Sequence, residues 1–357
     1  MKILFILADI TFVGGIERVI ANLSNALSKH NIEVEILSLY KSNSHCYFDI
    51  DKKIKISFLN ESLHYDGKPG SLKRLLKHLT NIKKLRNYLK ENSFDFIIAN
   101  SFPTAFQLYF SKKESNWIAY EHVHFNYYNY LVKKIRNLIY KKFDKIVVLT
   151  TKDEKKFSQI FNNVITIHNP LSFESSSVSN LENHTLIAVG RLEKQKGFDI
   201  LIDAFSKINN KNWRLNIFGE GNEHKKLLQK INSLGASNIY LMGKSNDIKR
   251  EMLYSSIFIL SSRFEGFPMV LGEAMECGLP CISFDCPNGP SDLIQHDHNG
   301  ILVKNGCTDS LARNIEMLIN NQKKINYLAE NAKSSVKELS ICNITNQWMT
   351  MLHQVKK

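Results

Sequence analysis

The sequence lacks the cysteine spacing of metal-binding or disulfide-linked domains. Its six cysteines form no C-x-x-C pair and are scattered along the 357 residues, at Cys46, Cys277, Cys281, Cys286, Cys307 and Cys342. Zinc knuckles and small disulfide frameworks depend on close, regular spacing, so this pattern argues against both. We expect reduced thiols, as in a cytosolic protein.

Long apolar runs are also missing. No stretch approaches the roughly 18 to 20 apolar residues of a membrane-spanning helix, so we expect any membrane contact to be peripheral. The opening residues, MKILFILADI, contain a short apolar run, but Asp9 interrupts it and no small-residue cleavage site follows. This run predicts a first β-strand rather than a secretion signal.

Two signatures of common ligand-binding domains are absent. The dinucleotide pattern G-x-G-x-x-G does not occur, which counts against a nicotinamide or flavin enzyme. No RNA- or DNA-binding motif is recognisable, so a nucleic-acid binder would rest on positive charge alone. We therefore expect no nucleic-acid partner.

Acidic residues are scarce in the first half of the chain. Residues 1–170 hold 26 Lys and Arg against 15 Asp and Glu, whereas the remainder holds 21 against 19. The segment 68–90 has eight basic residues, no acidic one, and leucines at helical spacing. A basic N-terminal half is consistent with a polyanionic partner, here an anionic membrane surface or a phosphorylated substrate. Solvent-exposed lysine faces explain the excess of positive charge equally well.

The chain repeats a short apolar run, a turn, and a segment with helical periodicity. This alternation is typical of βα units and predicts an α/β protein with parallel sheets. Strands are predicted at 2–7, 33–40, 55–59, 95–100, 117–122 and 145–150, then at 185–190, 214–219, 238–243, 257–262, 280–284 and 300–303. Helices are predicted at 16–29, 72–91, 197–208, 222–234 and 308–319.

One segment breaks this alternation. Residues 165–185 contain an Asn-Pro pair and a run rich in Ser and Asn, which predicts an interdomain linker. We therefore expect two Rossmann-like domains, at 1–168 and 169–339, with ligands at the carboxyl ends of the strands. The amphipathic segment 340–357 is predicted to pack back on the first domain.

The first stretch that could carry chemistry contains Gly14 and Gly15, between the first predicted strand and a helix. Adjacent glycines let backbone amides approach a phosphate, and a helix N-terminus adds partial positive charge. A plain turn before a helix would have the same sequence.

The second stretch, VGRLEKQKGFDILIDAF, places Arg191 and Lys196 between a strand and a helix. Two cations at the carboxyl edge of a sheet could clamp a diphosphate, the arginine through its planar fork and the lysine as a point charge. An ordinary basic loop is the alternative.

The third stretch, SSRFEGFPMVLGEAMECGLP at 261–280, contains Glu265 and Glu273. Pro268 suits the first turn of a helix, where backbone amides from 266 to 270 would point outward. The spacing puts Glu265 at the mouth of this helix and Glu273 inside it, so one carboxylate could meet a sugar and the other a ribose diol. A helix cap plus one surface glutamate is the alternative for an isolated pair.

Several stretches, read in order, resemble the retaining glycosyltransferases of family 4: GGIERV, AYEH, VGRLEKQKGFDILIDAF, FGEGNEHKKL and RFEGFPMVLGEAMECGLPCIS. The resemblance covers practically the whole chain, and its most specific part is the E-x7-E element with the upstream arginine and lysine. It implies the GT-B fold, in which two Rossmann-like domains face each other across a central cleft. The N-terminal domain would bind the acceptor, and the C-terminal domain the nucleotide sugar.

The resemblance also implies roles for individual residues. Arg191 and Lys196 would hold the diphosphate and stabilise the leaving group, helped by the amides at Gly14 and Gly15, so that no metal and no cofactor is required. Glu265 would contact the donor sugar near its reacting face, and Glu273 the ribose hydroxyls. The other donor-binding positions are Gly219, Gly266, Phe267, Pro268, Met269, Val270 and Leu271.

His122, in the stretch YEHVH, matches a histidine of the family that lies near the sugar. It would act in catalysis by orienting the transferred hexose or the acceptor. Without the resemblance, His122 reads as an ordinary structural histidine on a strand, because twelve histidines occur and His124 lies two residues further on.

The segments 285–303 and 343–352 resemble bacterial polysaccharide and glycolipid members of the family. They imply transfer of a hexose or N-acetylhexosamine from a UDP-sugar, preferred over a GDP-sugar, to a lipid-linked or polysaccharide acceptor. O-antigen, capsule or glycolipid synthesis would then take place on the cytoplasmic face of the inner membrane. The aromatic run 124–142 fits an acceptor or membrane surface, or a partly buried helix.

Two other functions stay open. A non-hydrolysing UDP-sugar epimerase would share the two-domain fold, although the context of Glu265 and Glu273 fits transferases better. A non-catalytic partner subunit would keep the fold without the chemistry, and the intact set of Arg191, Lys196, Glu265 and Glu273 argues against it.

Overall fold

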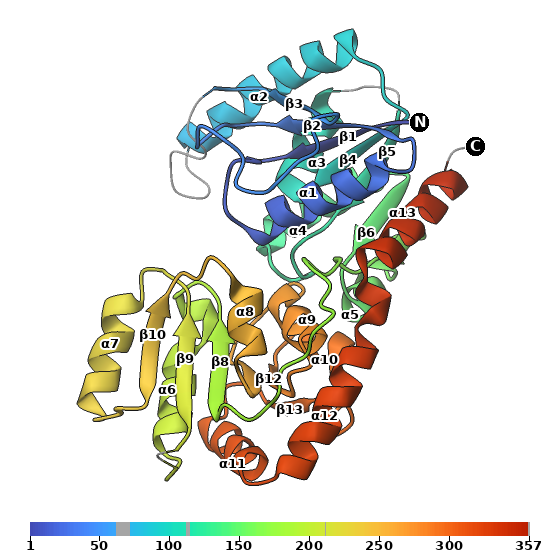
Figure 1. Cartoon of the computed structure of the whole chain (residues 1–357). Coiled ribbons are helices and arrows are strands. Elements are labelled where there is room, and N and C mark those ends of the chain that lie inside the picture. Colours follow the sequence, from blue (N-terminus) through green and yellow to red (C-terminus); the bar gives the residue numbers. More distant parts are fainter. Residues whose placement is uncertain (62–71, 112–114, 211, 356–357) are drawn as a thin grey trace. The chain divides into compact units, whose positions relative to one another are not determined.

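A computed structural model of the chain describes residues 1–61, 72–111, 115–210 and 212–355 (Figure 1). The chain forms two compact units. The first consists of Met1–Ser172 with Ile341–Lys357, and the second of Phe173–Ser340. The division falls close to the boundary expected between residues 168 and 169.

The first unit is built on a parallel sheet of seven strands in the order β3-β2-β1-β4-β5-β6-β7. The strands are β1 (Lys2–Leu7), β2 (Glu33–Ser38), β3 (Lys55–Phe58), β4 (Phe96–Asn100), β5 (Asn116–Tyr120), β6 (Lys145–Val148) and β7 (Val164–Thr166). The central strands are apolar along their length because the faces of a parallel sheet are covered by helices. In β4, for example, all five residues are buried.

The helices of the first unit are α1 (Gly15–Ser28), α2 (Leu72–Glu91), α3 (Phe102–Ser111), α4 (Tyr130–Tyr140), α5 (Thr151–Phe157) and α13 (Ile341–Val355). The last of these is separated in sequence from the rest of the unit by the whole second unit, and it packs against α1. Its Trp348 is completely buried, with its ring edge-on to those of Phe5 and Tyr120, at centroid distances of 6.5 and 4.9 Å.

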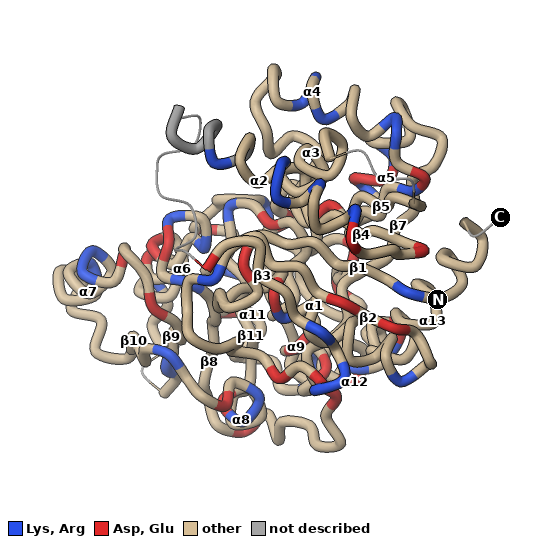
Figure 2. Tube along the Cα trace, turned by 90° about the horizontal axis from the view of Figure 1, so that it is seen from above, with Lys and Arg blue, Asp and Glu red and all other residues tan. Residues whose placement is uncertain are grey.

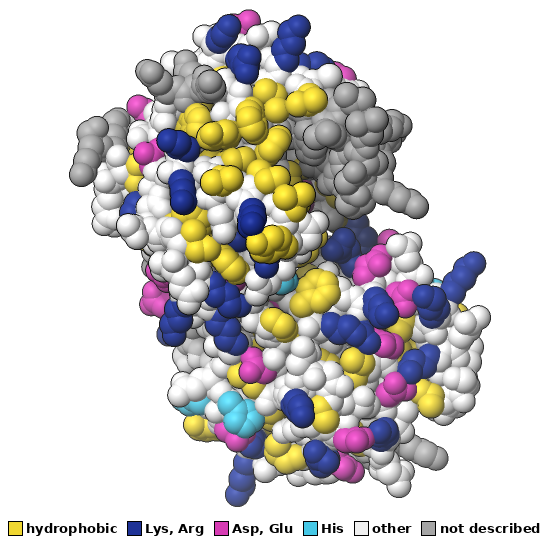
Figure 3. All heavy atoms as spheres, turned by 180° about the vertical axis from the view of Figure 1, so that it is seen from behind, with side chains coloured by type: hydrophobic (Ala, Val, Ile, Leu, Met, Phe, Trp, Pro, Cys, Tyr) yellow, Lys and Arg dark blue, Asp and Glu magenta, His cyan; other side chains and the backbone are white. Residues whose placement is uncertain are grey.

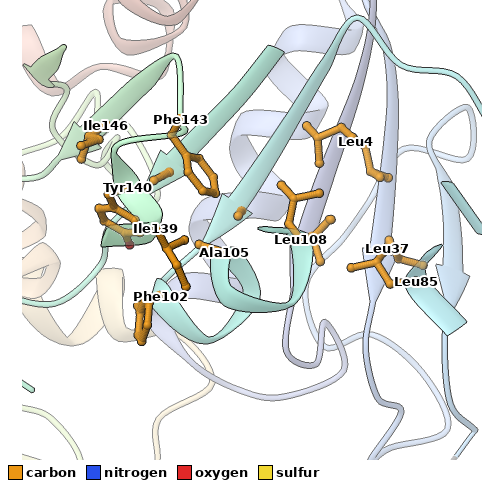
Figure 4. Packing of buried hydrophobic residues seen from close by; sticks show 14 of the residues in the cluster. Leu4, Leu37, Leu85, Phe102, Ala105, Leu108, Ile139, Tyr140, Phe143 and Ile146 are labelled. Atoms are coloured by element: carbon orange, nitrogen blue, oxygen red, sulfur yellow. The ribbon is translucent and has the colours of Figure 1, made fainter. Parts of the chain in front are cut away.

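One hydrophobic core joins the sheet of the first unit to α2, α3 and α4. Phe102 and Leu108 of α3 and Tyr140 of α4 point into the same cluster as Leu4 of β1 and Leu85 of α2 (Figure 4). All five side chains are buried. This packing fixes α3, which begins directly after β4.

The second unit contains a parallel sheet of six strands in the order β10-β9-β8-β11-β12-β13. They are β8 (Thr185–Val189), β9 (Arg214–Phe218), β10 (Ile239–Gly243), β11 (Ile257–Leu260), β12 (Cys281–Asp285) and β13 (Ile301–Lys304). Around them lie α6 (Phe198–Ser206), α7 (His224–Ser233), α8 (Ile248–Leu253), α9 (Met269–Glu276), α10 (Pro290–Leu293), α11 (Thr308–Ile319) and α12 (Gln322–Ser335), with the short 3₁₀ turns η1 (Lys194–Lys196) and η2 (Lys337–Leu339).

Each sheet has a point at which the strand order reverses. In the first unit this point lies between β1 and β4, and in the second between β8 and β11. Loops that leave such a point diverge, and the space beside the carboxyl ends of the two strands is where open α/β sheets bind ligands. The prediction of an α/β fold with two Rossmann-like domains is confirmed.

The predicted linker is wrong at its beginning. Residues 164–166 form the edge strand β7, which pairs in parallel with β6. A strand of three partly exposed residues has almost no periodicity of its own, and its pairing with β6 rather than its composition makes it a strand.

Basic residues recur along α2 and α4 of the first unit (Figure 2). The basic segment 68–90 begins outside the described residues, which resume at 72. Figure 3 shows hydrophobic side chains gathered on one face of this unit, with lysine or arginine among them. None of the helices in the described parts of the chain has the length and hydropathy needed to span a membrane.

Helix α4 exposes three large apolar side chains. Tyr130, Leu131 and Leu138 are 71%, 67% and 67% exposed. Lys134 is exposed among them and lies over the Tyr130 ring at 4.6 Å. With Lys141, just after the helix, these residues recur at helical spacing, so they form one outward stripe, residues 130, 131, 134, 138 and 141.

Candidate active site

The loops that follow β8 and β11 meet at the reversal point of the second sheet. Lys196 ends the turn η1 after β8, and Glu265 lies in the loop between β11 and α9. The lysine Nζ is 2.7 Å from Glu265 Oε1, and the two side chains are only 16% and 7% exposed. The fold therefore brings together two of the residues singled out in the sequence, 69 positions apart, as a largely buried ion pair.

Arg191 lies elsewhere in the same loop. It lies two residues after the end of β8 and is exposed, whereas Lys196 is partly buried. The sequence suggested a clamp formed by these two cations. In the structure, the partner of Lys196 is Glu265, and Arg191 remains at the surface of the unit.

A third residue, Arg263, ties the two loops to each other. Its guanidinium forms a two-pronged ion pair with Asp199 at the start of α6, at 2.9 and 2.7 Å. The same side chain donates to the carbonyl of Lys194 at 2.6 Å, and the Arg263 amide donates to the carbonyl of Gln195 at 2.8 Å. The Gln195 side chain in turn donates to the carbonyl of Phe264 at 3.0 Å.

These contacts fix the position of Lys196 relative to Glu265. Burial alone would raise the pKa of Asp199, but the hydrogen bonds and charge of Arg263 lower it, so the carboxylate is held ionised. A two-pronged pair between arginine and a carboxylate also restricts orientation more than a single hydrogen bond does. No local pattern predicts this clamp, because Arg263 and Asp199 are 64 residues apart.

Two glycines allow the loops to approach closely. Gly197, directly after Lys196, has φ +65°, and a Cβ atom there would overlap the carbonyl oxygen of Ser261. Gly219, which follows β9, has φ +141°, and its Cβ would overlap the carbonyl oxygen of Gly190. Both positions thus need glycine for conformation and for space. Gly219 thus lets the segment after β9 contact the loop that carries Arg191.

The start of α9 lies next to Glu265. Pro268 is the N-cap, and the helix begins at Met269. The sequence suggested that amides from 266 to 270 point outward; of these, the Met269 amide instead donates within the turn, to the carbonyl of Phe267 at 3.0 Å. Just beyond that range, the Leu271 amide donates to the carbonyl of Pro268 at 2.9 Å. Met269 and Val270 are half-buried, and Leu271 is completely buried.

Glu265 and Glu273 are both buried, at 6% and 1% exposure. Glu273 lies within α9, and Glu265 lies before it, with the small Gly266 next in the loop. Burial, together with the negative charge of Glu265, raises the pKa of the Cys286 thiol to about 12, so this thiol is neutral at neutral pH.

In the first unit, Gly14 and Gly15 lie between β1 and α1. Gly14 is the N-cap of α1, and its φ of −151° is extended backbone that any residue can adopt. The loop before it is held by Asp9, which accepts hydrogen bonds from the Thr11 amide at 2.9 Å and the Ser42 amide at 2.8 Å. A turn therefore precedes α1 as expected, but its conformation does not require glycine.

His122 is the other candidate in the first unit. It lies two residues beyond the end of β5, rather than on the strand as the sequence suggested. Its side chain is 8% exposed, its Nε2 is 3.1 Å from Asn100 Oδ1, and its ring lies 4.1 Å from that of Tyr120. Burial lowers the pKa of His122 to about 3. His124 is more exposed and contacts Tyr127.

In the ranges that the structure covers, no three His, Cys, Asp or Glu side chains are grouped so that they could hold a metal ion.

The sequence matches two family profiles. Residues 13–174 match Glycosyltransferase Family 4, and residues 172–335 match Glycosyl transferases group 1. An uncharacterized glycosyltransferase from Haemophilus influenzae is 31% identical over 363 residues, covering 98% of this chain and 99% of the relative. The chain belongs to the glycosyltransferases. The profile boundary near residue 172 coincides with the division between the two units.

Other relatives of this glycosyltransferase act in the synthesis of bacterial glycans. The amylovoran biosynthesis glycosyltransferase AmsD of Erwinia amylovora is 29% identical, over 99% of both chains. A second is the GalNAc-α-(1→4)-GalNAc-α-(1→3)-diNAcBac-PP-undecaprenol α-1,4-N-acetyl-D-galactosaminyltransferase of Campylobacter jejuni, which is 28% identical over 100% of this chain and 99% of the relative.

A solved structure supports the fold. Anabaena Alr3699/HepE, in complex with UDP and glucose, matches this glycosyltransferase with a TM-score of 0.78 at 20% identity, over 99% of each chain. At that identity the likeness concerns the fold alone.

Sequence reasoning missed three residues of the candidate site. Arg263 and Asp199 hold the β8 and β11 loops together, and Asn100 holds His122. Arg263 lies two residues before Glu265, and Asn100 ends a predicted strand, but neither position carries a pattern that predicts its partner.

Proposed function

We propose that this glycosyltransferase moves a hexose or N-acetylhexosamine from a UDP-sugar to a lipid-linked or polysaccharide acceptor, with retention of the anomeric configuration. The observation that carries the proposal is the buried pair of Lys196 and Glu265 at the reversal point of the second sheet. A cation and a carboxylate held side by side there fit a donor that carries both a diphosphate and a sugar.

The cationic part of the site would bind the diphosphate. Lys196 has three N–H donors, of which Glu265 takes one, and Arg191 adds an exposed guanidinium in the same loop. When the bond from the anomeric carbon to the β-phosphate oxygen breaks, negative charge develops on that phosphate. Preorganised cations stabilise this charge, so we propose that no metal is required.

The carboxylates would bind the sugar and the nucleoside. We propose that Glu265 contacts the transferred sugar and that Glu273 accepts hydrogen bonds from the ribose hydroxyls. The new bond forms from an acceptor oxygen to the anomeric carbon on the face that the diphosphate leaves, and the acceptor proton passes to the β-phosphate oxygen. No carboxylate then needs to form a covalent intermediate.

The first unit would contribute contacts of its own. We propose that amides at Gly14 and Gly15 bind a phosphate oxygen and that His122 binds a sugar hydroxyl, on the transferred hexose or on the acceptor. A relative whose acceptor is a saccharide on undecaprenyl diphosphate supports a lipid-linked acceptor. UDP as the nucleotide is part of the proposal, and the Anabaena neighbour of the same fold was solved with UDP.

A turnover assay tests the proposal. The purified protein is incubated with UDP-glucose, UDP-galactose or their N-acetyl forms, without added metal, and UDP release is measured with and without a lipid-diphosphate saccharide acceptor. Lys196→Ala and Glu273→Gln should abolish release, whereas Lys207→Ala, an exposed lysine of the same unit, should not. Undiminished release in both site variants would contradict the site, and conversion of a UDP-sugar without acceptor would indicate an epimerase.

We further propose that the outward stripe of α4 docks the protein on an anionic membrane of the cytoplasmic side. Its aromatic and leucine side chains suit the interface between headgroups and acyl chains, and its lysines suit anionic headgroups. Each basic residue near such a surface contributes about 1 kcal/mol, and salt screens it. Docking would bring a peripheral enzyme to a lipid-linked acceptor.

Vesicle flotation tests this docking. We expect recovery with anionic vesicles to exceed that with neutral ones, and the combined variant Tyr130→Ser/Leu131→Ser/Leu138→Ser to lose it. A matched control replaces one exposed tyrosine and two exposed leucines of the second unit, as Tyr254→Ser/Leu228→Ser/Leu234→Ser. Equal recovery with both vesicle types, or equal loss in both variants, would contradict a specific role for α4.

A further inference from the structure

Asn100 connects His122 to the central strand of the first sheet. It is the last residue of β4 and is 3% exposed. Its Nδ2 donates to the carbonyl of Ile6 in β1 at 3.0 Å, and its Oδ1 lies 3.1 Å from Nε2 of His122. The amide thus lies between one main-chain carbonyl and one imidazole ring.

Chemistry decides which way this amide points. A main-chain carbonyl only accepts hydrogen bonds, so the Asn100 atom that faces Ile6 must be the NH₂ group. The oxygen of Asn100 then faces the ring, and an amide oxygen only accepts. The nitrogen of His122 that faces it must therefore carry a hydrogen.

This fixes the protonation of the whole ring. His122 is buried and its pKa is lowered to about 3, so the ring is neutral at neutral pH and holds a single N–H. Because that hydrogen is on Nε2, Nδ1 has a free lone pair. In the described parts of the chain, Asn100 is the sole hydrogen-bond partner of the ring. The Tyr120 ring packs against the imidazole, and its hydroxyl is anchored to Asn169 Oδ1 at 2.7 Å.

We infer that Asn100 is a positioning residue that holds His122 with its hydrogen on Nε2, so that Nδ1 accepts a hydrogen bond from a sugar hydroxyl. The inference deepens the role proposed above for His122 and rests on it for the identity of the ligand. It also sets a specificity. A hydroxyl can donate to Nδ1, whereas a carboxylate or a carbonyl group at the same place cannot.

The tautomer can be measured without any substrate. We would label the histidines of the full-length protein with ¹⁵N and record long-range ¹H–¹⁵N correlations at pH 7, assigning His122 by its loss in His122→Asn. We expect Nε2 protonated and Nδ1 unprotonated. Asn100→Leu, which cannot accept, should shift the ring toward the other tautomer, and Asn100→Asp, which can, should retain the first.

The tautomer measurement distinguishes a positioning role of Asn100 from a purely structural one. A wild-type ring protonated on Nδ1, or an unchanged tautomer in Asn100→Leu, would overturn it. If Asn100→Leu does not fold, the tautomer of His122 can still be measured in the wild type and in Asn100→Asp.

Kinetics with the UDP-sugar that the protein uses then tests the ligand. His122→Asn, whose amide lies where Nδ1 lies, should keep more activity than His122→Gln, whose amide lies where Nε2 lies. We expect Asn100→Leu to lower kcat/KM about tenfold, the value of roughly one hydrogen bond. Equal losses in His122→Asn and His122→Gln would overturn the role of Nδ1. A correct tautomer without transfer of any sugar would instead contradict the proposed function.

Discussion

The ion pair of Lys196 and Glu265 allows a quantitative prediction. At the 2.7 Å between Nζ and Oε1, Coulomb's law with an effective dielectric constant of about 20 gives an attraction on the order of 6 kcal/mol. Much of this offsets the cost of removing both charges from water. Removing one partner of a buried pair is nevertheless costly, about 3 to 5 kcal/mol, because the other charge stays buried and alone.

We therefore expect Lys196→Met to destabilise the second unit by about 3 kcal/mol. The double variant Lys196→Met/Glu265→Gln should be less destabilised than the sum of the two single variants by at least about 2 kcal/mol. The same lysine variant should lower kcat by about 100- to 1000-fold, the usual effect of removing one group that stabilises transition-state charge.

Amide hydrogen exchange read by mass spectrometry is the suitable assay, because peptides from β8 and β11 report the second unit alone. The exposed pair of Lys207 and Asp309, at 2.6 Å, is a matched control in the same unit, and its coupling should be much smaller. Effects of Lys196→Met and Glu265→Gln that add within about 0.5 kcal/mol would refute the reasoning, since they would mean that the two charges do not depend on each other.

Three further predictions concern other groups. Arg263→Lys keeps the charge but loses the two-pronged pair with Asp199. In steady-state kinetics we expect a higher KM for the UDP-sugar and a lower kcat, so that kcat/KM falls about tenfold. Unchanged kinetics would contradict the role of the clamp. Burial raises the pKa of Glu121 to about 7, so its contribution to stability is fully present below about pH 4.5 and is lost as pH rises through 7. In chemical denaturation, the free energy of unfolding of Glu121→Gln should therefore rise by about 2 to 3 kcal/mol relative to that of the wild type between pH 5 and 8. A difference that stays constant with pH would contradict this. Turnover should survive treatment with EDTA, measured as UDP release, and a loss restored by Mg²⁺ or Mn²⁺ would contradict a site in which protein groups rather than a metal stabilise the diphosphate.

Much of the fold could be predicted because parallel strands buried on both sides read as short apolar runs. Helices α2 and α11 lie where their leucine periodicity predicts them, at Leu72–Glu91 and Thr308–Ile319. Other elements had no such signal. The stretch that forms α3, FPTAFQLYFS, is apolar and aromatic on most sides, so helical periodicity is hidden, and packing against α2 and α4 decides its structure.

The candidate site was predictable only in part. Glu265 and Lys196 stand out because they lie in loops that follow strands, and parallel strands bring their carboxyl ends to one edge. Their pairing, and the exposure of Arg191, depend on how two loops fold against each other. That arrangement is set by Arg263 and Asp199 and by the close contact at Gly197, which are tertiary features that no local pattern contains.

Above all, we propose that a UDP-sugar binds beside Lys196 in the second unit. Saturation-transfer NMR on the purified protein, without metal and with UDP, GDP, UDP-glucose, UDP-galactose and their N-acetyl forms, tests it most directly. We predict selective binding of UDP and one UDP-sugar to the wild type and to Lys207→Ala, and loss of that binding in Lys196→Ala. Failure to bind any UDP compound, or undiminished binding in Lys196→Ala, would contradict the claim.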